Sequence, residues 1–430
     1  MRRRLLLAAA LVALVALAAI TAASAPAKSQ AETLTVWLQN DAQSGWPDAV
    51  AAANSQFKAQ HPGVDVKVQY LSWGEHQTKF DAALAGGNAP DVKELGNTET
   101  VKYMSAGVLA DLTSQKGSFP NSRTWLQGLA DSVTFNGKLY GVPYYAGARA
   151  VIYRVDQYRQ AGVPTRAPKN LDQFVANGRK LMQKFGSDRN YSALYFPGKN
   201  WYASMSFVYD YGGRIARFRN GKWEGALNSP QAIAGLTKLK SVVLQLSRAN
   251  KTGDEANPQQ ALVFSKGKVA SFIGNGWEWP YALDPKVGNP SLAGKIGAYP
   301  MPSHTTGKYM PTFLGGSDLV VPATSKNKQL AADWIKAFTD TASMTAIAKA
   351  GNIPNTTSLV AINAAKPTLA PFARAAKYSW FVPAAKNWAN VESANVLQNM
   401  LVSIFTGRSS IKSAADRASS QITQILNQDR

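Results

Sequence analysis

The stretch TLTVWLQ (residues 33–39) opens the region that decides the fold, because Leu34, Val36 and Leu38 recur at every second position and predict a β-strand. The region continues as a helical segment, a second strand, another helical segment and a third strand, at residues 47–59, 64–71, 76–85 and 91–95. Strands that alternate with helices form a parallel sheet through right-handed crossovers. The first part of the chain is therefore predicted to be α/β.

The size of the chain indicates more than one folded unit. Its 430 residues are 45% hydrophobic and 17% charged, which is typical of a globular protein. A single hydrophobic core stops growing at about 250–300 residues, so we expect two lobes. The chain has no cysteine, which excludes disulfides and thiolate metal sites. Its three histidines, His61, His76 and His304, are far apart in sequence, so we expect no metal centre and no cofactor.

Residues 1–31 have the pattern of a secretory signal peptide. Three arginines (residues 2–4) precede an apolar run at residues 5–20, which is shorter than the ~20 residues that a membrane-spanning helix needs. Small residues follow, and we expect cleavage after residue 25 or residue 31. An uncleaved membrane anchor is the alternative. No later segment is apolar enough to span a membrane, so we expect an exported, soluble protein.

The chain is strongly basic. Once Arg2, Arg3, Arg4 and Lys28 of the predicted signal peptide are set aside, 43 Lys and Arg remain against 26 Asp and Glu. These basic residues are scattered rather than gathered in blocks, which argues against a nucleic-acid-binding protein. The charge is compatible with residence near an anionic cell wall or membrane, and equally with an ordinary solvated surface.

Local signals predict the elements beyond residue 95. Asn136-Gly137 and Asn220-Gly221 are each typical of a two-residue β-hairpin turn. Ser229 followed by Pro230 is typical of a helix start. We expect helices at residues 171–185, 230–248 and 328–339, and throughout residues 393–427. No Pro- or Gly-rich linker divides the chain, so the two lobes are expected to be interleaved in sequence.

Short segments along the whole chain match one family in order. The most specific are APDV (residues 89–92), GVLADLT (107–113) and FNGKLYGVP (135–143). Others are FSKGKVA, GNGW, FLGG, AADWIK and GNIP, at residues 264–270, 274–277, 313–316, 331–336 and 351–354. The chain resembles the extracellular solute-binding proteins of ATP-driven sugar importers, the maltose-binding-protein-like family. FVP (381–383) and WANVE (388–392) resemble its chitobiose-binding branch.

The resemblance implies two α/β lobes with a ligand cleft between them. Crossing strands would join the lobes near residues 147–151, 312–319 and 351–356. We expect the N-terminal lobe to comprise residues 32–148 and 315–352, and the C-terminal lobe to comprise residues 149–314 and 353–430. The resemblance also implies a monomer that captures an oligosaccharide, expected to be a disaccharide, by lobe closure and delivers it to a membrane permease. Many Gram-positive members carry a lipid-modified Cys, which this chain lacks.

The resemblance also places sugar contacts in the second lobe. Sugars need flat aromatic rings against their C–H faces and planar polar groups for their hydroxyls. Trp277 aligns with a stacking Trp of the family, and Glu278 beside it is a candidate hydroxyl acceptor. Trp388 matches a second aromatic platform, and Asn200 and Trp201 lie in a segment that matches a sugar-contacting loop. Packing inside the lobe is the alternative for these tryptophans.

Candidates in the first lobe follow strand ends, where ligands bind in open α/β sheets. Tyr145 at the first crossing and Gly316 at the second are also candidates, with hinge geometry as the alternative for Gly316. The strand-end candidates are Asn40, Asp41, Trp73, Glu94 and Asn97.

Other functions fit the sequence less well. A secreted glycosidase needs two carboxyl groups roughly 5–9.5 Å apart, and the sequence marks no partner for Glu278. No motif of another enzyme class is present, so we expect no enzyme and no catalytic residue. Peptide, polyamine or metal ligands are alternatives, but the eleven tryptophans favour a sugar. An anionic sugar stays open because the positive charge would attract it.

Overall fold

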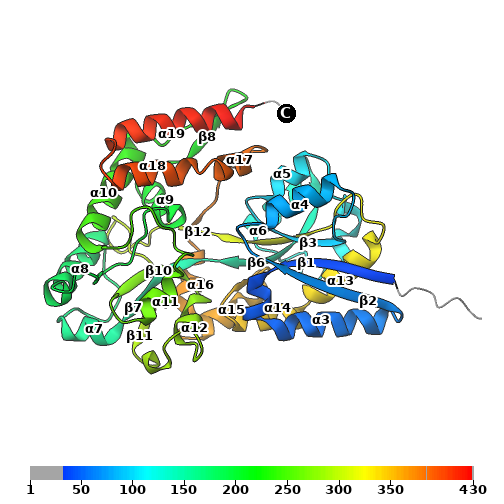
Figure 1. Ribbon diagram of the computed structural model, residues 1–430, viewed down its shortest axis with the longest axis horizontal. Helices are drawn as coiled ribbons and strands as arrows, with labels where there is room; N and C mark the ends of the chain where they lie inside the picture. Colours follow the sequence, from blue (N-terminus) through cyan, green and yellow to red (C-terminus); the bar gives the residue numbers. More distant parts are fainter. Residues whose placement is uncertain (1–31, 384, 429–430) are drawn as a thin grey trace, which may run out of the picture.

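The computed structural model describes residues 32–383 and 385–428. It has two lobes, each with a β-sheet and helices packed against it, which lie side by side in Figure 1. The predicted signal peptide, residues 1–31, lies outside the described residues. Within the described part of the chain, no helix is long and apolar enough to cross a membrane.

A six-stranded sheet forms the centre of the first lobe, with the strand order β14-β6-β13-β3-β1-β2. β1, β2 and β3 are parallel, as predicted, and β13 is antiparallel to both of its neighbours, β3 and β6. The α/β class is confirmed. The strands are β1 (Glu32–Gln39), β2 (Val64–Leu71), β3 (Val92–Gly96), β6 (Gly141–Gly147), β13 (Gly315–Val320) and β14 (Ile353–Pro354).

Helices cover both faces of this sheet because its strands carry apolar side chains on both sides. On one face, Leu34 and Val36 of β1 belong to the same buried cluster as Phe57 of α3. On the other face, Trp37 packs with the cluster that contains Phe80 of α4. Figure 1 shows the two groups of helices on opposite sides of the sheet: α3 (Pro47–Gln60), α13 (Lys328–Phe338) and α14 (Thr341–Lys349), and α4 (His76–Ala85) and α5 (Thr100–Ser105).

The second lobe contains a three-stranded antiparallel sheet of order β10-β7-β11. Its core includes the helix that begins at Pro230, where the Ser229 side chain accepts a hydrogen bond from the Ala232 N–H, as the sequence predicted. The elements are β7 (Arg149–Arg154), β10 (Ser271–Asn275), β11 (Ile296–Tyr299), α7 (Val155–Gln160), α8 (Leu171–Phe185), α9 (Trp201–Asp210), α10 (Pro230–Leu246), α11 (Gln260–Ser265), α12 (Glu278–Leu283) and α16 (Ala370–Ala376).

The chain passes between the lobes near the expected positions. β6 of the first sheet continues through Ala148 into β7 of the second. β12 (Thr312–Phe313), which pairs with β15 (Ser379–Trp380), continues through Leu314 into β13. The exact lobe boundaries stay a prediction. β14 follows the predicted boundary at residue 352 yet pairs with β6 in the first sheet, next to α15 (Val360–Ala365).

Both predicted hairpins form. Asn136 and Gly137 have φ angles of 48° and 75°, and Asn220 and Gly221 have 49° and 77°, the left-handed values that favour Asn-Gly. They connect β4 (Thr134–Phe135) with β5 (Lys138–Leu139), and β8 (Ala216–Arg219) with β9 (Lys222–Gly225).

The predicted continuous C-terminal helix is wrong. Residues 393–427 contain α18 (Val396–Phe405) and α19 (Ile411–Leu426), which follow α17 (Trp388–Ser393). The chain turns at Gly407, whose φ of 73° no helix accommodates, and Ser410 then caps the next helix by accepting from the Ser413 N–H. The predicted helix at residues 230–248 likewise ends earlier, at Leu246.

Candidate ligand-binding site

A cavity of about 400 Å³ lies between the lobes. The first lobe contributes the loop between β3 and α5 and the residues after β1 and β2. The second lobe contributes the segment from β10 into α12, and α17 adds one side chain. The cavity therefore lies at the carboxyl ends of the parallel strands, where open α/β sheets bind ligands. Its volume lies in the ~300–1,000 Å³ range of small-molecule sites.

Seven of the sequence-predicted site residues line this cavity. They come from both lobes and from the crossings, as the resemblance implied. They are Asp41, Trp73, Asn97, Tyr145, Trp277, Glu278 and Gly316.

Trp277 forms part of the cavity wall between two tight backbone positions. Its ring lies edge-on to Tyr145, with centroids 6.5 Å apart and an interplanar angle of 88°. A Cβ atom at Gly147 would lie 2.7 Å from the Trp277 ring, so this glycine leaves room for the ring at the crossing. A Cβ atom at Gly276 would lie 2.2 Å from the Gly351 carbonyl oxygen. The absence of a side chain at Gly147 and Gly276 therefore allows the Trp277 segment to pack closely against the crossings.

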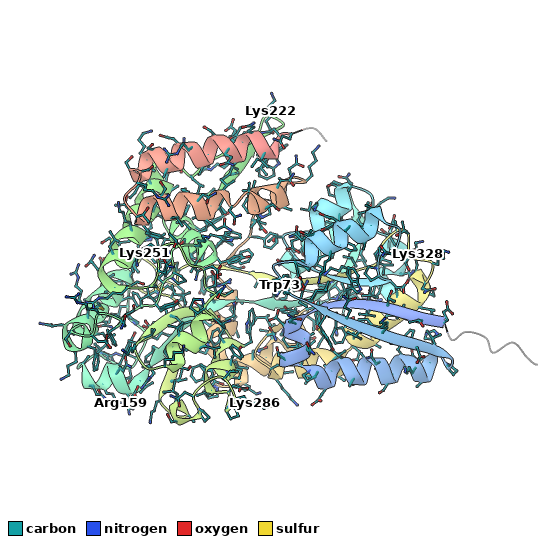
Figure 2. The ribbon with its side chains drawn as sticks, viewed as in Figure 1. Trp73, Arg159, Lys222, Lys251, Lys286 and Lys328 are labelled. Carbon is teal, nitrogen blue, oxygen red and sulfur yellow. The ribbon has the colours of Figure 1, made fainter. Side chains whose placement is uncertain are left out.

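Trp73 projects from the first lobe and is 43% exposed. Figure 2 shows it near the middle of the molecule, where the two lobes meet. Its Nε1 donates to Asp41 Oδ2 at 2.5 Å, and its ring lies edge-on to His76 at 5.1 Å. Burial raises the pKa of Asp41, although the Trp73 hydrogen bond partly offsets this. Trp73 thus offers an open aromatic face held in place by a carboxylate.

Asn97 and Gly316 connect the first lobe to a crossing. The Asn97 N–H donates to the Gly316 carbonyl at 2.9 Å, and its side-chain Nδ2 donates to the Leu314 carbonyl at 3.2 Å. A Cβ at Gly316 would lie 2.1 Å from the Tyr145 carbonyl oxygen, so only glycine fits there. These contacts keep the loop after β3 against the cavity.

Five predicted residues do not line the cavity. Glu94 is fully buried inside the first lobe, where its Oε2 accepts from the Gln39 N–H at 2.8 Å. Burial raises its pKa to about 7. Asn40 is exposed at the start of α2 (Asn40–Gly45), and Asn200 is buried and caps α9 by accepting from the Ala203 N–H. The remaining two are Trp201 and Trp388.

Trp201 and Trp388 belong to the core of the second lobe. Their ring centroids lie 6.2 Å apart, and they are 4% and 0% exposed. Burial of such large rings in the core is strongly favourable. Trp388 still bears on the cavity, because its Nε1 donates at 2.5 Å to Oε1 of the cavity residue Glu392.

The cavity also contains residues that were not in the predicted site. Glu392 lies in the WANVE segment of the resemblance, and Tyr202 directly follows Trp201. For these two residues the sequence identified the correct segment but not the side chain that lines the cavity. Arg149, Asn275 and Gly315 lie at the predicted crossings or in the GNGW region. Phe313 begins the FLGG segment of the resemblance, whereas no sequence signal marked Glu99, Glu255, Gln259 and Gln260.

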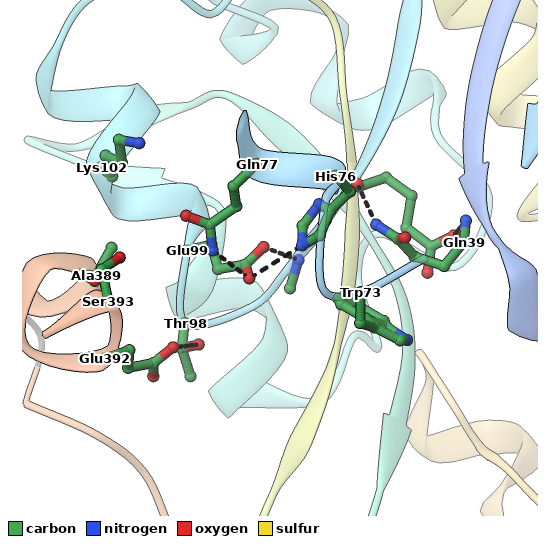
Figure 3. Close-up of polar contacts among 12 residues, drawn as sticks. Gln39, Trp73, His76, Gln77, Thr98, Glu99, Lys102, Ala389, Glu392 and Ser393 are labelled. Carbon is green, nitrogen blue, oxygen red and sulfur yellow. Dashed lines mark hydrogen bonds and ion pairs between the residues drawn. The ribbon is translucent and has the colours of Figure 1, made fainter. Parts of the chain in front are cut away.

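Hydrogen bonds hold Glu99 in a fixed position. Its Oε1 accepts from Gln77 Nε2 at 2.5 Å and lies 3.3 Å from His76 Nε2, and its Oε2 accepts from the Gly96 N–H at 2.9 Å (Figure 3). Burial alone would raise the pKa of Glu99, but these partners outweigh it and leave the pKa below its usual value. Glu99 is therefore an ionised carboxylate at the cavity wall.

Glu392 joins the two lobes. It projects from α17, and its Oε2 accepts from Thr98 Oγ1 of the first lobe at 3.2 Å, as Figure 3 shows. Burial, and next the negative charge of Glu99, raise the pKa of Glu392 to about 8. Both of its hydrogen-bond donors, Thr98 and Trp388, are neutral.

Arg149 and Glu278 complete the polar lining. The Arg149 guanidinium lies over the Tyr202 ring at 4.5 Å, and its Nη2 is 3.9 Å from Glu255 Oε1. Glu278 Oε2 accepts from the Asn275 N–H at 2.7 Å and from Gln260 Nε2 at 3.2 Å. Burial raises the pKa of Glu278 to about 7 and also raises that of Glu255, although Arg149 opposes both shifts.

Three buried polar atoms of the lining have no hydrogen-bond partner among the described residues. They are Arg149 Nε, Gln260 Oε1 and Asn275 Oδ1. A buried polar atom without a partner costs about 1–3 kcal/mol, so these are the polar atoms of the lining residues that the protein itself leaves unsatisfied. In the described chain, no group of three or more His, Asp or Glu side chains is arranged to hold a metal ion.

Comparisons with known proteins agree with this geometry. A family model for bacterial extracellular solute-binding proteins matches residues 37–345. The diacetylchitobiose binding protein DasA of Streptomyces coelicolor is 34% identical over 383 residues, covering 88% of this chain and 86% of that protein. A galactooligosaccharide-binding protein of Bacillus subtilis is 25% identical over 335 residues, covering 76% of this chain and 73% of that protein.

A solved structure shows the same fold. The GacH receptor of Streptomyces glaucescens superposes with a TM-score of 0.80 at 22% identity, covering 94% of this chain and 100% of that one. The two-lobed architecture, the cavity between the lobes and the family match over most of the described residues thus agree, and the chain belongs to the bacterial extracellular solute-binding proteins.

Proposed function

We propose that this protein is the carbohydrate-binding component of an ATP-driven importer. It captures an oligosaccharide of disaccharide size between its lobes and presents it to the membrane permease. The observation that carries the proposal is the cavity lining, which combines the aromatic rings of Trp73 and Trp277 with the partnerless atoms of Arg149, Gln260 and Asn275. Aromatic rings match the C–H faces of a sugar, and the polar atoms match its hydroxyls.

The similar proteins indicate which class of sugar to expect. DasA is a diacetylchitobiose binding protein and matches 88% of this chain, which supports a β-linked disaccharide of amino sugars. The site residues we propose are those that line the cavity from both lobes. Asp41, Asn97 and Glu278 would accept or donate hydrogen bonds, and Tyr145 and Gly316 would shape the wall.

The proposed protein binds and releases its ligand unchanged. The matching family model describes bacterial extracellular solute-binding proteins, which supports binding without reaction. We further propose that the protein acts as a monomer and binds no nucleic acid. Its family is extracellular, so the protein is exported.

Thermal melting with a panel of sugars tests this function. Ligand at 100 times its dissociation constant adds about 2.7 kcal/mol to the free energy of unfolding and raises the melting temperature by a few degrees. We expect a rise with N,N′-diacetylchitobiose and none with peptides. Trp277→Ala should abolish the rise. Trp223→Ala, in the β8–β9 hairpin of the second lobe, is the matched control and should retain it.

A rise with a peptide alone would contradict the proposal and leave only the family assignment. Release of monosaccharide during incubation would instead indicate a hydrolase, so the sugar should be recovered intact.

A further inference from the structure

Acidic side chains predominate in the cavity lining, whereas the whole protein is basic. The chain has 47 Lys and Arg against 26 Asp and Glu, yet five carboxylates line the cavity. Among the described residues of the lining, Arg149 is the only Lys or Arg. The carboxylates are Asp41, Glu99, Glu255, Glu278 and Glu392.

Most of these carboxylates lack a cationic partner. The exceptions are Glu255, whose Oε1 lies 3.9 Å from Arg149 Nη2, and Glu99, whose Oε1 lies 3.3 Å from His76 Nε2. In the described part of the chain, no Lys or Arg forms an ion pair with Asp41, Glu278 or Glu392. Their hydrogen bonds come from tryptophan, hydroxyl, amide and backbone groups, all of them neutral. Glu278 is buried, and Asp41 and Glu392 are half-buried. Withdrawing a carboxylate from water without an ion-pair partner is costly, and the raised pKa values of all three agree with this cost.

The partnerless atoms of the lining independently indicate a ligand rich in donors. Gln260 Oε1 and Asn275 Oδ1 are hydrogen-bond acceptors on residues that are 1% and 5% exposed, and both line the cavity beside Glu278. An ammonium group has three N–H donors and no acceptor, so it satisfies acceptors and carboxylates together. A uronic acid would add a sixth carboxylate to the same cavity.

We propose that the cavity prefers a sugar with a free ammonium group, that is, an unacetylated amino sugar, over neutral and acidic sugars, because its five carboxylates face one guanidinium and its orphan acceptors require donors. This proposal rests on the proposed function and adds that the bound sugar is positively charged. The preference must arise locally, since the net positive charge of the protein repels cations at long range. This argues against the anionic sugar that the overall charge left open.

Three β-1,4-linked disaccharides that differ only at carbon 2 provide the test: the ammonium form, the acetamido form and cellobiose, which has a hydroxyl. Calorimetric titration at neutral pH and 0.15 M salt gives each dissociation constant. A hydrogen bond to a charged group exceeds a neutral one by about 1–1.5 kcal/mol, so we expect the ammonium form to bind about tenfold more tightly than cellobiose.

Variants show whether the cavity carboxylates cause the preference. Glu392→Gln keeps the shape of the side chain but cannot take up the negative charge that a bound ammonium group would favour, so the ratio of the two dissociation constants should fall severalfold. Glu224→Gln, an exposed residue of β9, changes the net charge equally and should leave the ratio unaltered. Glu255→Gln is a second variant with the same expected result, should Glu392→Gln melt at a much lower temperature.

Each outcome separates this inference from the proposed function. If cellobiose or the acetamido form binds as tightly as the ammonium form, the inference is overturned and sugar binding stands. If no disaccharide binds but spermidine does, the cavity binds a cation that is not a sugar, and the proposed function is overturned as well. Binding of none of these probes overturns both.

Discussion

Gly147 occupies a position where only a hydrogen atom fits beside the Trp277 ring. A Cβ there would lie 2.7 Å from one ring carbon and 2.9 Å from Asn275 Oδ1, closer than real Cβ contacts come. Gly147→Ala should therefore displace both cavity groups. We expect ligand affinity to fall about twofold to tenfold, since an aromatic contact contributes about 0.5–1.5 kcal/mol, and titration calorimetry measures this.

Gly45 provides the control for this substitution. A Cβ at Gly45, at the end of α2, would meet no atom within 4 Å, so Gly45→Ala should leave affinity unchanged. Unaltered affinity in Gly147→Ala would mean that the Trp277 ring does not contact the ligand.

Individual side chains also show where prediction from sequence stops. The resemblance located the segments around Trp201 and Trp388, but the neighbours Tyr202 and Glu392 line the cavity. Which side chain of a helix reaches a cavity depends on how the helix packs, and large aromatic rings gain more by burial in the core. Glu255 carried no local signal, because its position depends on a loop that packs beside Arg149.

At the scale of elements, Asp318 connects a central strand to two helices. From β13, its Oδ2 accepts from Thr100 Oγ1 of α5 at 2.6 Å, and its Oδ1 accepts from Ser132 Oγ of α6 (Gln127–Ser132) at 3.0 Å. Burial raises the pKa of Asp318 from its usual 3.8 to about 7, although both hydroxyls oppose the shift. The folded protein therefore favours the protonated acid.

This shift predicts how stability depends on pH. The contribution of Asp318 to stability is complete below pH ~4 and is lost as pH rises through about 7, because the unfolded chain then releases the proton more readily. Asp318→Asn cannot ionise. We expect the wild-type protein to lose more stability than this variant between pH 5 and pH 8, as measured by urea unfolding.

Asp48→Asn, at an exposed position of α3, should instead follow the wild-type protein across the same pH range. An equal pH dependence in the wild-type protein and Asp318→Asn would show that the strand–helix contact is maintained by the ionised carboxylate.

Elements were more predictable than sites. The first three strands, their two helices and both Asn-Gly hairpins match the sequence predictions, because alternation, helix caps and turn residues act locally. The C-terminal helix was predicted as one because its apolar pattern continues past Gly407. The turn there lets α18 and α19 pack against each other, which local pattern does not reveal.

For the whole molecule, we predict that ligand binding favours the closed arrangement of the lobes. Asp41 and Asn97 line the cavity from one lobe, and Glu278 and Glu392 from the other, so a ligand contacts all of them only when the lobes are together. The radius of gyration from small-angle X-ray scattering should fall when the sugar is added. Trp277→Ala with the same sugar should show no change. Compaction of that variant, or none in the wild-type protein, would contradict closure by the ligand.

The position of β13 between β6 and β3 has a consequence for synthesis of the chain. β3 ends at residue 96 and β13 begins at residue 315, about 220 residues later. At about 5–20 residues per second, a ribosome needs on the order of 10–40 s to supply the missing central strand. Until then, β3 and β6 have unpaired edges that can associate with other chains. A nascent or truncated chain that stops before residue 315 is therefore expected to need chaperone protection that the full-length protein does not.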